Sequence, residues 1–203
     1  MITIIAVTNA KSICCSTLNS ILYLNMHCIK KGEQTKLCFI ETRDQLKKYL
    51  KNQDRIVFFD YGSNINNDCV ETMISPLPKG FHAMVFPAVK EGVDWNLFKK
   101  KTLAGSSEPA EQRGLTFDTE VAKQIGDYIW TVNKTTPSVW VMDVKPVDKL
   151  IRGQNYPLGD EFFNWMQGKG VKICACTAAR CTQTYTFKCF ANILESSGVY
   201  IKK

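Results

Sequence analysis

The sequence predicts an α/β fold with a mostly parallel sheet and helices on both faces. Short apolar runs recur through the first half of the chain, and stretches with helical spacing separate them. One run, residues 56–59, is apolar throughout, as expected for a central strand that is covered on both sides. The 203 residues, 45% of them hydrophobic, are enough for a single domain with a substantial core.

The first half of the chain alternates strands and helices. Apolar positions from Leu18 to Ile29 follow helical spacing until Gly32, and Thr42 with Gln45 makes a capping box for a second helix. A short helix is expected around Asp68 to Ile74. The strands of this half are expected at residues 2–7, 36–40, 56–59 and 83–86.

The second half has a less regular pattern. Asp94 can cap a helix that starts at Trp95, and residues 102–116 carry the weakest core signal in the chain, so we expect a mobile loop there. A helix is expected to start near Gly159-Asp160 and to end at Gly168 to Gly170. Strands are expected at residues 127–132, 138–142, 171–175 and 182–187, and a short helix is expected at the C-terminus.

The charge balance limits the kinds of partner. Lys and Arg number 26 against 19 Asp and Glu, which gives a net charge of +7, but the basic residues are dispersed. Without a basic and aromatic stripe we expect no nucleic-acid partner; a solvated surface or a phosphorylated small molecule accounts for the charge. No apolar run reaches the roughly 18–20 residues of a transmembrane segment. The apolar residues 2–7 are interpreted as a strand and not as a signal peptide.

Nine cysteines are scattered along the chain. Their odd number and irregular spacing do not suggest a disulfide framework, so we expect a reducing, cytoplasmic location. Cys174, Cys176 and Cys181 lie close enough in sequence to suggest zinc, but a structural zinc site takes four ligands and a fourth is not evident. Core thiols are the favoured interpretation.

Ligands of open α/β sheets bind beyond the carboxyl ends of the strands. That rule selects Thr8 to Lys11, Asp60 to Ser63 and the region after Phe86. Asp60 ends the most apolar strand, where a carboxylate needs a cation or a hydrogen-bond donor. It is either a ligand group or the cap of its own turn, because Asp-x-Gly-Ser also favours turns.

The order of these features resembles the GT-A glycosyltransferases, and the small size resembles the compact glycosyltransferase domains encoded by large DNA viruses. The resemblance implies a cytoplasmic enzyme, virus-encoded and acting in a host cell, with a nucleotide-sugar donor and a glycan or other hydroxyl acceptor. It also implies a nucleotide-binding half, 1–90, and an acceptor and catalytic half, 91–203. It is carried by Thr8-Asn9, Asp60, the segment Gly92-Val93-Asp94-Trp95, and Gly159-Asp160-Glu161-Phe162-Phe163 before a helix ending in Gly168-Lys169-Gly170.

Site roles follow from this resemblance. Thr8 and Asn9 match the loop that contacts the base, and Asp60 matches the first Asp of the Asp-x-Asp motif that holds Mn²⁺ or Mg²⁺ on the diphosphate. Gly62 replaces the second Asp, a departure that leaves one carboxylate for the metal. Asp160 and Glu161 match the late acidic pair that supplies the acceptor's base; as residues at a helix start they could instead be caps.

Three further residues complete the predicted site. Lys11 and Arg113 are candidates for pairing with the diphosphate, and Arg113 lies in the expected mobile loop, which could close over the donor. Trp95 could stack on a sugar ring, or it could belong to the core.

Two other functions stay open. A binding or structural protein on the same fold is favoured by the missing second Asp and by the lack of any histidine after His82. A nucleotidyltransferase would need a glycine-rich phosphate loop after the first strand, and Asn9-Ala10-Lys11-Ser12 contains no glycine.

Overall fold

Most of the described strands form one central sheet. A computed structural model describes residues 1–203 except 52, 91, 180 and 184–203. Within these residues eight strands form one sheet in the order β2-β1-β3-β8-β5-β9-β7-β6. The strands are β1 (Ile2–Val7), β2 (Thr35–Ile40), β3 (Arg55–Phe59), β5 (Ala83–Val85), β6 (Thr119–Gly126), β7 (Ile129–Thr135), β8 (Val139–Asp143) and β9 (Ile173–Cys176).

The sheet is mostly parallel. Strands β1, β2 and β3 pair in parallel, as do β5 and β9. Strand β8 runs antiparallel to both β3 and β5, and β7 runs antiparallel to β9 and β6. All of the described sheet strands except β7 and β8 therefore share one direction, and their carboxyl ends lie along one edge. The predicted α/β fold with a mostly parallel sheet is confirmed.

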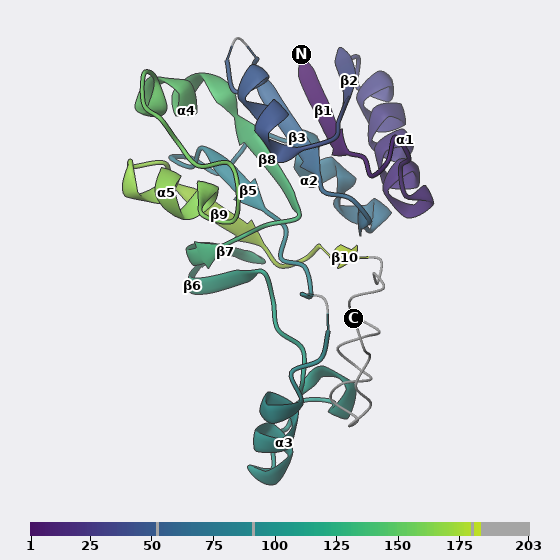
Figure 1. Cartoon of the computed structure of the whole chain (residues 1–203), viewed down its shortest axis with the longest axis vertical. Coiled ribbons are helices and arrows are strands. Elements are labelled where there is room, and N and C mark those ends of the chain that lie inside the picture. The colour runs from purple at the N-terminus through teal and green to yellow at the C-terminus, as the bar shows by residue number, and fades with distance from the viewer. Residues whose placement is uncertain (52, 91, 180, 184–203) are drawn as a thin grey trace.

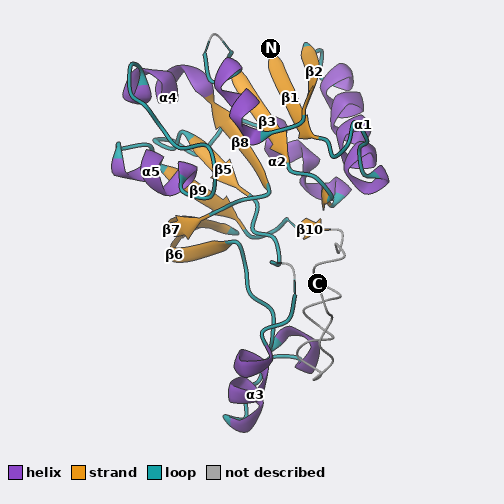
Figure 2. Cartoon of the chain, viewed as in Figure 1, coloured by secondary structure: helices purple, strands orange, loops and turns teal. Residues whose placement is uncertain are grey.

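Helices cover both faces of the sheet (Figures 1 and 2). One face packs against η1 (Arg43–Lys48), α4 (Val144–Ile151) and α5 (Phe162–Gly168), and the other against α1 (Cys15–Lys30), η2 (Asn67–Cys69) and α2 (Val70–Ile74). Strand β3 supplies both cores, because Ile56 and Phe58 point to the first face and Val57 and Phe59 to the second. This alternation of apolar residues on both sides explains why the run 56–59 is apolar throughout.

A fully buried tryptophan anchors the first core. Trp140 of β8 stacks on Phe58 at 4.9 Å between ring centroids and meets Phe163 edge-on at 5.3 Å. These three residues join β3, β8 and α5, which lie far apart in the sequence. Offset and edge-on aromatic pairs add stabilisation beyond the burial of area. Trp140 is a core residue.

Several elements differ from the sequence-based expectation. Strand β6 and helix α4 were not predicted, and neither was the three-residue strand β4 (Ser63–Ile65), which pairs with β10 (Cys181–Gln183) in a separate two-stranded sheet. The capping box at Thr42 is not formed: the Gln45 side chain accepts a hydrogen bond from the Glu41 amide instead, and the segment is a 3₁₀ helix. The expected terminal helix and the end of the last strand lie outside the described residues.

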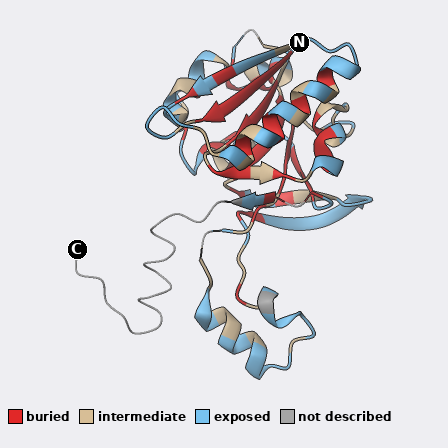
Figure 3. Ribbon diagram, turned by 90° about the vertical axis from the view of Figure 1, so that its right-hand side faces the viewer, coloured by how far each residue is buried: buried red, intermediate tan, exposed pale blue. Residues whose placement is uncertain are grey.

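An arm separates β5 from β6 (Figures 1 and 3). It carries α3 (Trp95–Leu103) and η3 (Ala110–Gln112), and α3 has no buried residue. Asp94 caps α3 through a hydrogen bond from the Leu97 amide, as predicted. The two limbs of the arm pair through hydrogen bonds from the Lys90 and Asp94 amides to the carbonyl oxygens of Thr116 and Gly114. In the described residues no helix is long and apolar enough to cross a membrane.

Candidate functional site at the carboxyl edge of the sheet

Three neighbouring strands bring the candidate residues to one edge. The parallel register pairs Val7 of β1 with Ile40 of β2, and Ala6 with Phe59 of β3. The segments after these strands therefore begin side by side, and they contain Thr8, Arg43 and Asp60 respectively. The rule that ligands bind beyond the carboxyl ends of strands selects this edge.

Asp60 is held by two donors. Its Oδ1 accepts a hydrogen bond from the Tyr61 amide at 2.9 Å, and its Oδ2 pairs with the guanidinium of Arg43. The Asp60 side chain is 17% exposed and that of Arg43 is 31% exposed, so water screens this pair less than it would screen a surface pair. Sequence reasoning missed Arg43. Its place three residues after β2 was the available signal, since the same rule selected Thr8 and Asp60.

Asp160 reaches the same guanidinium. Its Oδ1 lies 3.6 Å from Arg43 Nη1, and its side chain is 83% exposed. The acidic pair has no capping role at α5, because that helix begins after Glu161 without a side-chain capping hydrogen bond. Arg43 thus joins the predicted metal ligand Asp60 to the predicted base Asp160. We call these three residues the Arg43 cluster.

The loop after β1 is a tight two-residue turn. Asn9 and Ser12 exchange backbone hydrogen bonds of 2.9 Å in both directions, and Ala10 and Lys11 both have positive φ, 48° and 62°. This is the type I′ arrangement, in which Asn and Gly are the usual central residues. Non-glycine residues in this conformation are strained, and such strain is found preferentially at functional sites. The hydroxyl and the amide of Thr8 both donate hydrogen bonds to the carbonyl oxygen of Ile40, which links the ends of β1 and β2.

The donor set at Asp60 does not fit a divalent cation. Mn²⁺ and Mg²⁺ prefer several oxygen ligands, with carboxylates foremost. Gly62, at the place of the second Asp, has φ 74° in a turn closed by the Ser63 amide and hydroxyl on the Asp60 carbonyl, and an L-residue there is strained. In the described part of the chain no group of three or more His, Cys, Asp or Glu could hold a metal ion.

Asp118 is a buried carboxylate that sequence reasoning also missed. It accepts hydrogen bonds from the Ala88 amide at 3.0 Å, the Thr119 hydroxyl at 2.8 Å and the Ser138 amide at 3.2 Å. Burial raises the pKa of Asp118, while these donors and Lys90 lower it. Because the Ser138 carbonyl accepts from the Asp60 amide at 2.8 Å, Asp118 fixes the strand ends next to the Arg43 cluster.

Trp95 and Arg113 lie on the arm, away from the strands that carry the Arg43 cluster (Figures 1 and 3). Arg113 donates to the carbonyl oxygens of Glu108 and Ser106 and so closes the chain after α3. Trp95 packs edge-on against Phe98 and is 45% exposed. The structure therefore brings Thr8, Asp60 and Asp160 to one edge and leaves these two residues apart from it.

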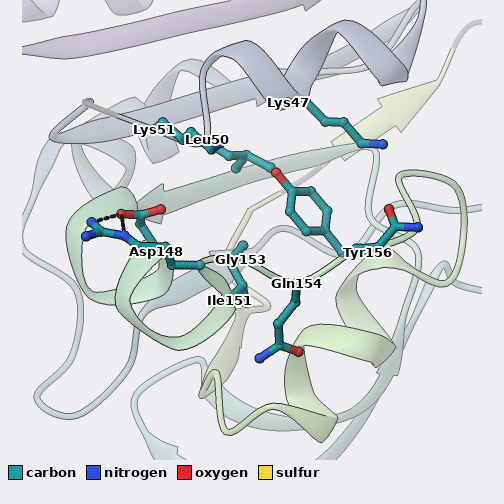
Figure 4. Close-up of a pocket in the computed structure, with 10 residues that line it drawn as sticks. Lys47, Leu50, Lys51, Asp148, Ile151, Gly153, Gln154 and Tyr156 are labelled. Carbon is teal, nitrogen blue, oxygen red and sulfur yellow. Dashed lines mark hydrogen bonds and ion pairs between the residues drawn. The ribbon is translucent and has the colours of Figure 1, made fainter.

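Two larger recesses lie nearby. One, of about 410 Å³, lies between η1 and the end of α4, and Lys47, Lys51 and Tyr156 line it together with the Asp148–Arg152 ion pair (Figure 4). The other, of about 390 Å³, lies beyond the ends of β5 and β9, at the root of the arm, and is lined in part by Pro87, Phe117 and Ala179. Arg43 and Asp160 line a small pocket of about 20 Å³, together with Thr136 and Pro137.

The late cysteines lie in the core. Cys174 and Cys176 are buried residues of β9, and Cys181 begins β10. Burial raises the pKa of Cys174 to about 12, and it also raises the pKa of Cys176 and of Cys181. Without a bound metal, thiols in such surroundings stay protonated.

The fold is shared with solved structures of low sequence identity. The chain aligns over 92% of its length with 87% of A197 from STIV, at a TM-score of 0.50 and 12% identity. It aligns over 96% with 47% of GalNAc-T7 solved with UDP, GalNAc and Mn²⁺, at a TM-score of 0.55 and 9% identity. It also aligns over its full length with 98% of a putative glucose-1-phosphate thymidylyltransferase from Bacillus anthracis in complex with a sucrose (TM-score 0.53, 11% identity).

No protein-family model and no curated protein matches the sequence significantly. The structural likeness establishes the GT-A-like fold that glycosyltransferases and nucleotidyltransferases share. The chain spans about half the length of GalNAc-T7.

Proposed function

We propose that the protein transfers a sugar from a nucleoside diphosphate donor to a hydroxyl acceptor, and that the carboxyl edge of the sheet is the active site. The convergence of Arg43, Asp60 and Asp160 at the strand ends carries this proposal. A site for a diphosphate needs a cation with anchored geometry, and a site for glycosyl transfer needs a carboxylate nearby to act as a base. The Arg43 cluster supplies both.

In the proposed reaction, Asp160 takes the proton of the acceptor hydroxyl. The acceptor oxygen forms a bond to the anomeric carbon, the bond from that carbon to the diphosphate oxygen breaks, and the nucleoside diphosphate leaves with the electron pair. A single displacement of this kind inverts the anomeric configuration. Thr8 and Asn9, on the neighbouring strand end, are proposed to contact the base, and Glu161 is the alternative general base.

A nucleotidyltransferase is less well supported, although the full-length alignment favours it as the second candidate. Such an enzyme would cradle phosphates with the backbone amides of the loop after β1. Here the amides of Asn9 and Ser12 are used within their own turn. An inactive binding protein would still bind the nucleotide at the carboxyl edge of the sheet but would not transfer the sugar. An assay of sugar transfer therefore separates it from the enzyme.

We expect binding of at least one member of a panel of nucleoside diphosphates and nucleotide sugars in calorimetric titration, and Asp60→Ala should weaken it at least about tenfold, because Arg43 loses its anchor. The titrations are run both with Mn²⁺ and with a chelator. As a matched control, Lys51→Gln removes a cation from the recess of Figure 4 and should leave the affinity unchanged. Loss of binding in Lys51→Gln, with wild-type affinity in Asp60→Ala, would move the site to that recess.

The turn after β1 offers a separate test. Lys11→Gly and Ala10→Gly should each stabilise the fold by about 0.5–1 kcal/mol in thermal unfolding, because glycine adopts positive φ without strain. If Lys11 pairs with the diphosphate, only Lys11→Gly should also weaken nucleotide binding. Equal affinity in both variants would remove Lys11 from the proposed site.

A further inference from the structure

We propose that the guanidinium of Arg43 takes the place of the divalent cation at this site, so that the diphosphate is bound without metal. This inference rests on the proposed function. In the resembled family the cation sits on the carboxylate that ends the apolar strand. In this chain that carboxylate, Asp60, carries Arg43, which comes from the end of the strand two positions away in the sheet.

The geometry of Arg43 suits a bound anion. A guanidinium carries five N–H donors in a planar fork, which matches phosphate and carboxylate oxygens. The contacts to Asp60 and Asp160 use Nη2 and Nη1. The contact with Asp60 restrains the guanidinium, which lowers the entropy that is lost when an anion binds.

The surroundings of Asp60 favour a guanidinium over a divalent cation. Both oxygens of Asp60 already accept hydrogen bonds, from Tyr61 and from Arg43, and the turn requires a residue with positive φ at Gly62. A cation on Asp60 would have to displace Arg43, and the other carboxylate on that guanidinium is the exposed Asp160.

Asp160 is the partner that a phosphate can replace. The Arg43 cluster has one positive against two negative charges, so a diphosphate would be repelled while both carboxylates stay in place. Asp160 is the more exposed of the two and lies farther from the guanidinium, and exposed ion pairs of this kind are weak. Donor binding would therefore exchange Asp160 for a phosphate oxygen at Nη1, and the freed carboxylate would be available as the acceptor's base.

The test is calorimetric titration of the full-length protein with the nucleotide panel, first with a chelator and then with Mn²⁺. We expect wild-type affinity to be the same within about threefold in both conditions. Arg43→Gln should weaken binding roughly 10–100-fold in both, as for the loss of charge-assisted hydrogen bonds. Arg43→Lys keeps the positive charge but lacks the planar fork of donors, so its nucleotide affinity should lie between those of the wild type and Arg43→Gln. The matched control is Arg152→Gln, which removes another arginine paired with an aspartate and should bind as the wild type does.

The outcomes separate this inference from the proposed function. Nucleotide binding that appears only with Mn²⁺ would overturn the proposed role of Arg43 but would leave the proposed sugar transfer standing. No nucleotide binding in either condition would overturn the proposed sugar transfer. Wild-type affinity in Arg43→Gln would also overturn the inference. If Arg43→Gln does not fold, Asp160→Ala gives an independent readout: removal of the displaced carboxylate should tighten nucleotide binding by roughly 2–10-fold, and unchanged or weaker binding would contradict the exchange.

Discussion

Asp160→Asn is expected to lower sugar transfer by about 10²–10⁴-fold while nucleotide binding becomes tighter. The range is that of losing a positioned general base. Asparagine has nearly the same shape but cannot take the acceptor's proton, and it removes one negative charge from the Arg43 cluster. The measurement is the initial rate of nucleoside diphosphate release with a nucleotide sugar that binds, next to a titration of the same variant.

Glu161→Gln is the matched control for Asp160→Asn. The two residues are neighbours at the start of α5, and only Asp160 contacts Arg43 in an ion pair of the described residues. We expect Glu161→Gln to keep turnover within a few-fold of the wild type. A large loss in Glu161→Gln with normal turnover in Asp160→Asn would assign the base to Glu161. No turnover in the wild type, with binding intact, would identify the inactive binding protein.

Asp118→Ala is expected to destabilise the fold by about 3 kcal/mol, because it leaves the Ala88 and Ser138 amides and the Thr119 hydroxyl without this acceptor. For a chain of this size such a loss lowers the melting temperature by roughly 6–12 °C in thermal unfolding. Asp127→Ala, at an exposed turn between β6 and β7, is the matched control and should melt as the wild type does. A melting temperature unchanged in Asp118→Ala would contradict the structural role.

Asp118 also predicts a pH dependence. Its pKa in the folded state is raised above 3.8, chiefly by burial, so the folded protein binds this proton more tightly than the unfolded chain. The contribution to stability is therefore fully present below pH 3.8 and is lost as the pH rises through the folded pKa. The difference in unfolding free energy between the wild type and Asp118→Asn should change across this window and become constant above it.

Much of the fold could be predicted from the sequence because its signals are local. The apolar run 56–59 is continuous since β3 is buried on both faces. Helix α1 lies where helical spacing predicts it, but its buried face is made by Thr17, Ser20, Ile21, Leu24 and Cys28, and Leu22, Met26 and Ile29 of the expected apolar face are exposed. Strand β6 was missed because seven of its eight residues are exposed and no apolar alternation marks it. Strand β4 was missed because three residues are too few to show a period.

The site could be predicted only in part. The strand-end rule finds Thr8 and Asp60, since it follows from the order of the elements alone. The strand-end rule brings Arg43 to the same edge but does not say that it meets Asp60, because Arg43 follows β2 and reaches Asp60 across the intervening strand β1. Trp95 and Arg113 were chosen for their type and their loop, and the arm that carries them is a tertiary feature without a local pattern.

The most direct test of the account is a crystal structure of the protein with a nucleoside diphosphate that binds, grown with a chelator present. The account predicts the diphosphate at the carboxyl edge of β1, β2 and β3, with phosphate oxygens within hydrogen-bond distance of the Arg43 guanidinium and with Asp160 turned away from it. A nucleotide bound in the recess between η1 and α4 (Figure 4), with the Arg43 cluster unchanged, would contradict it.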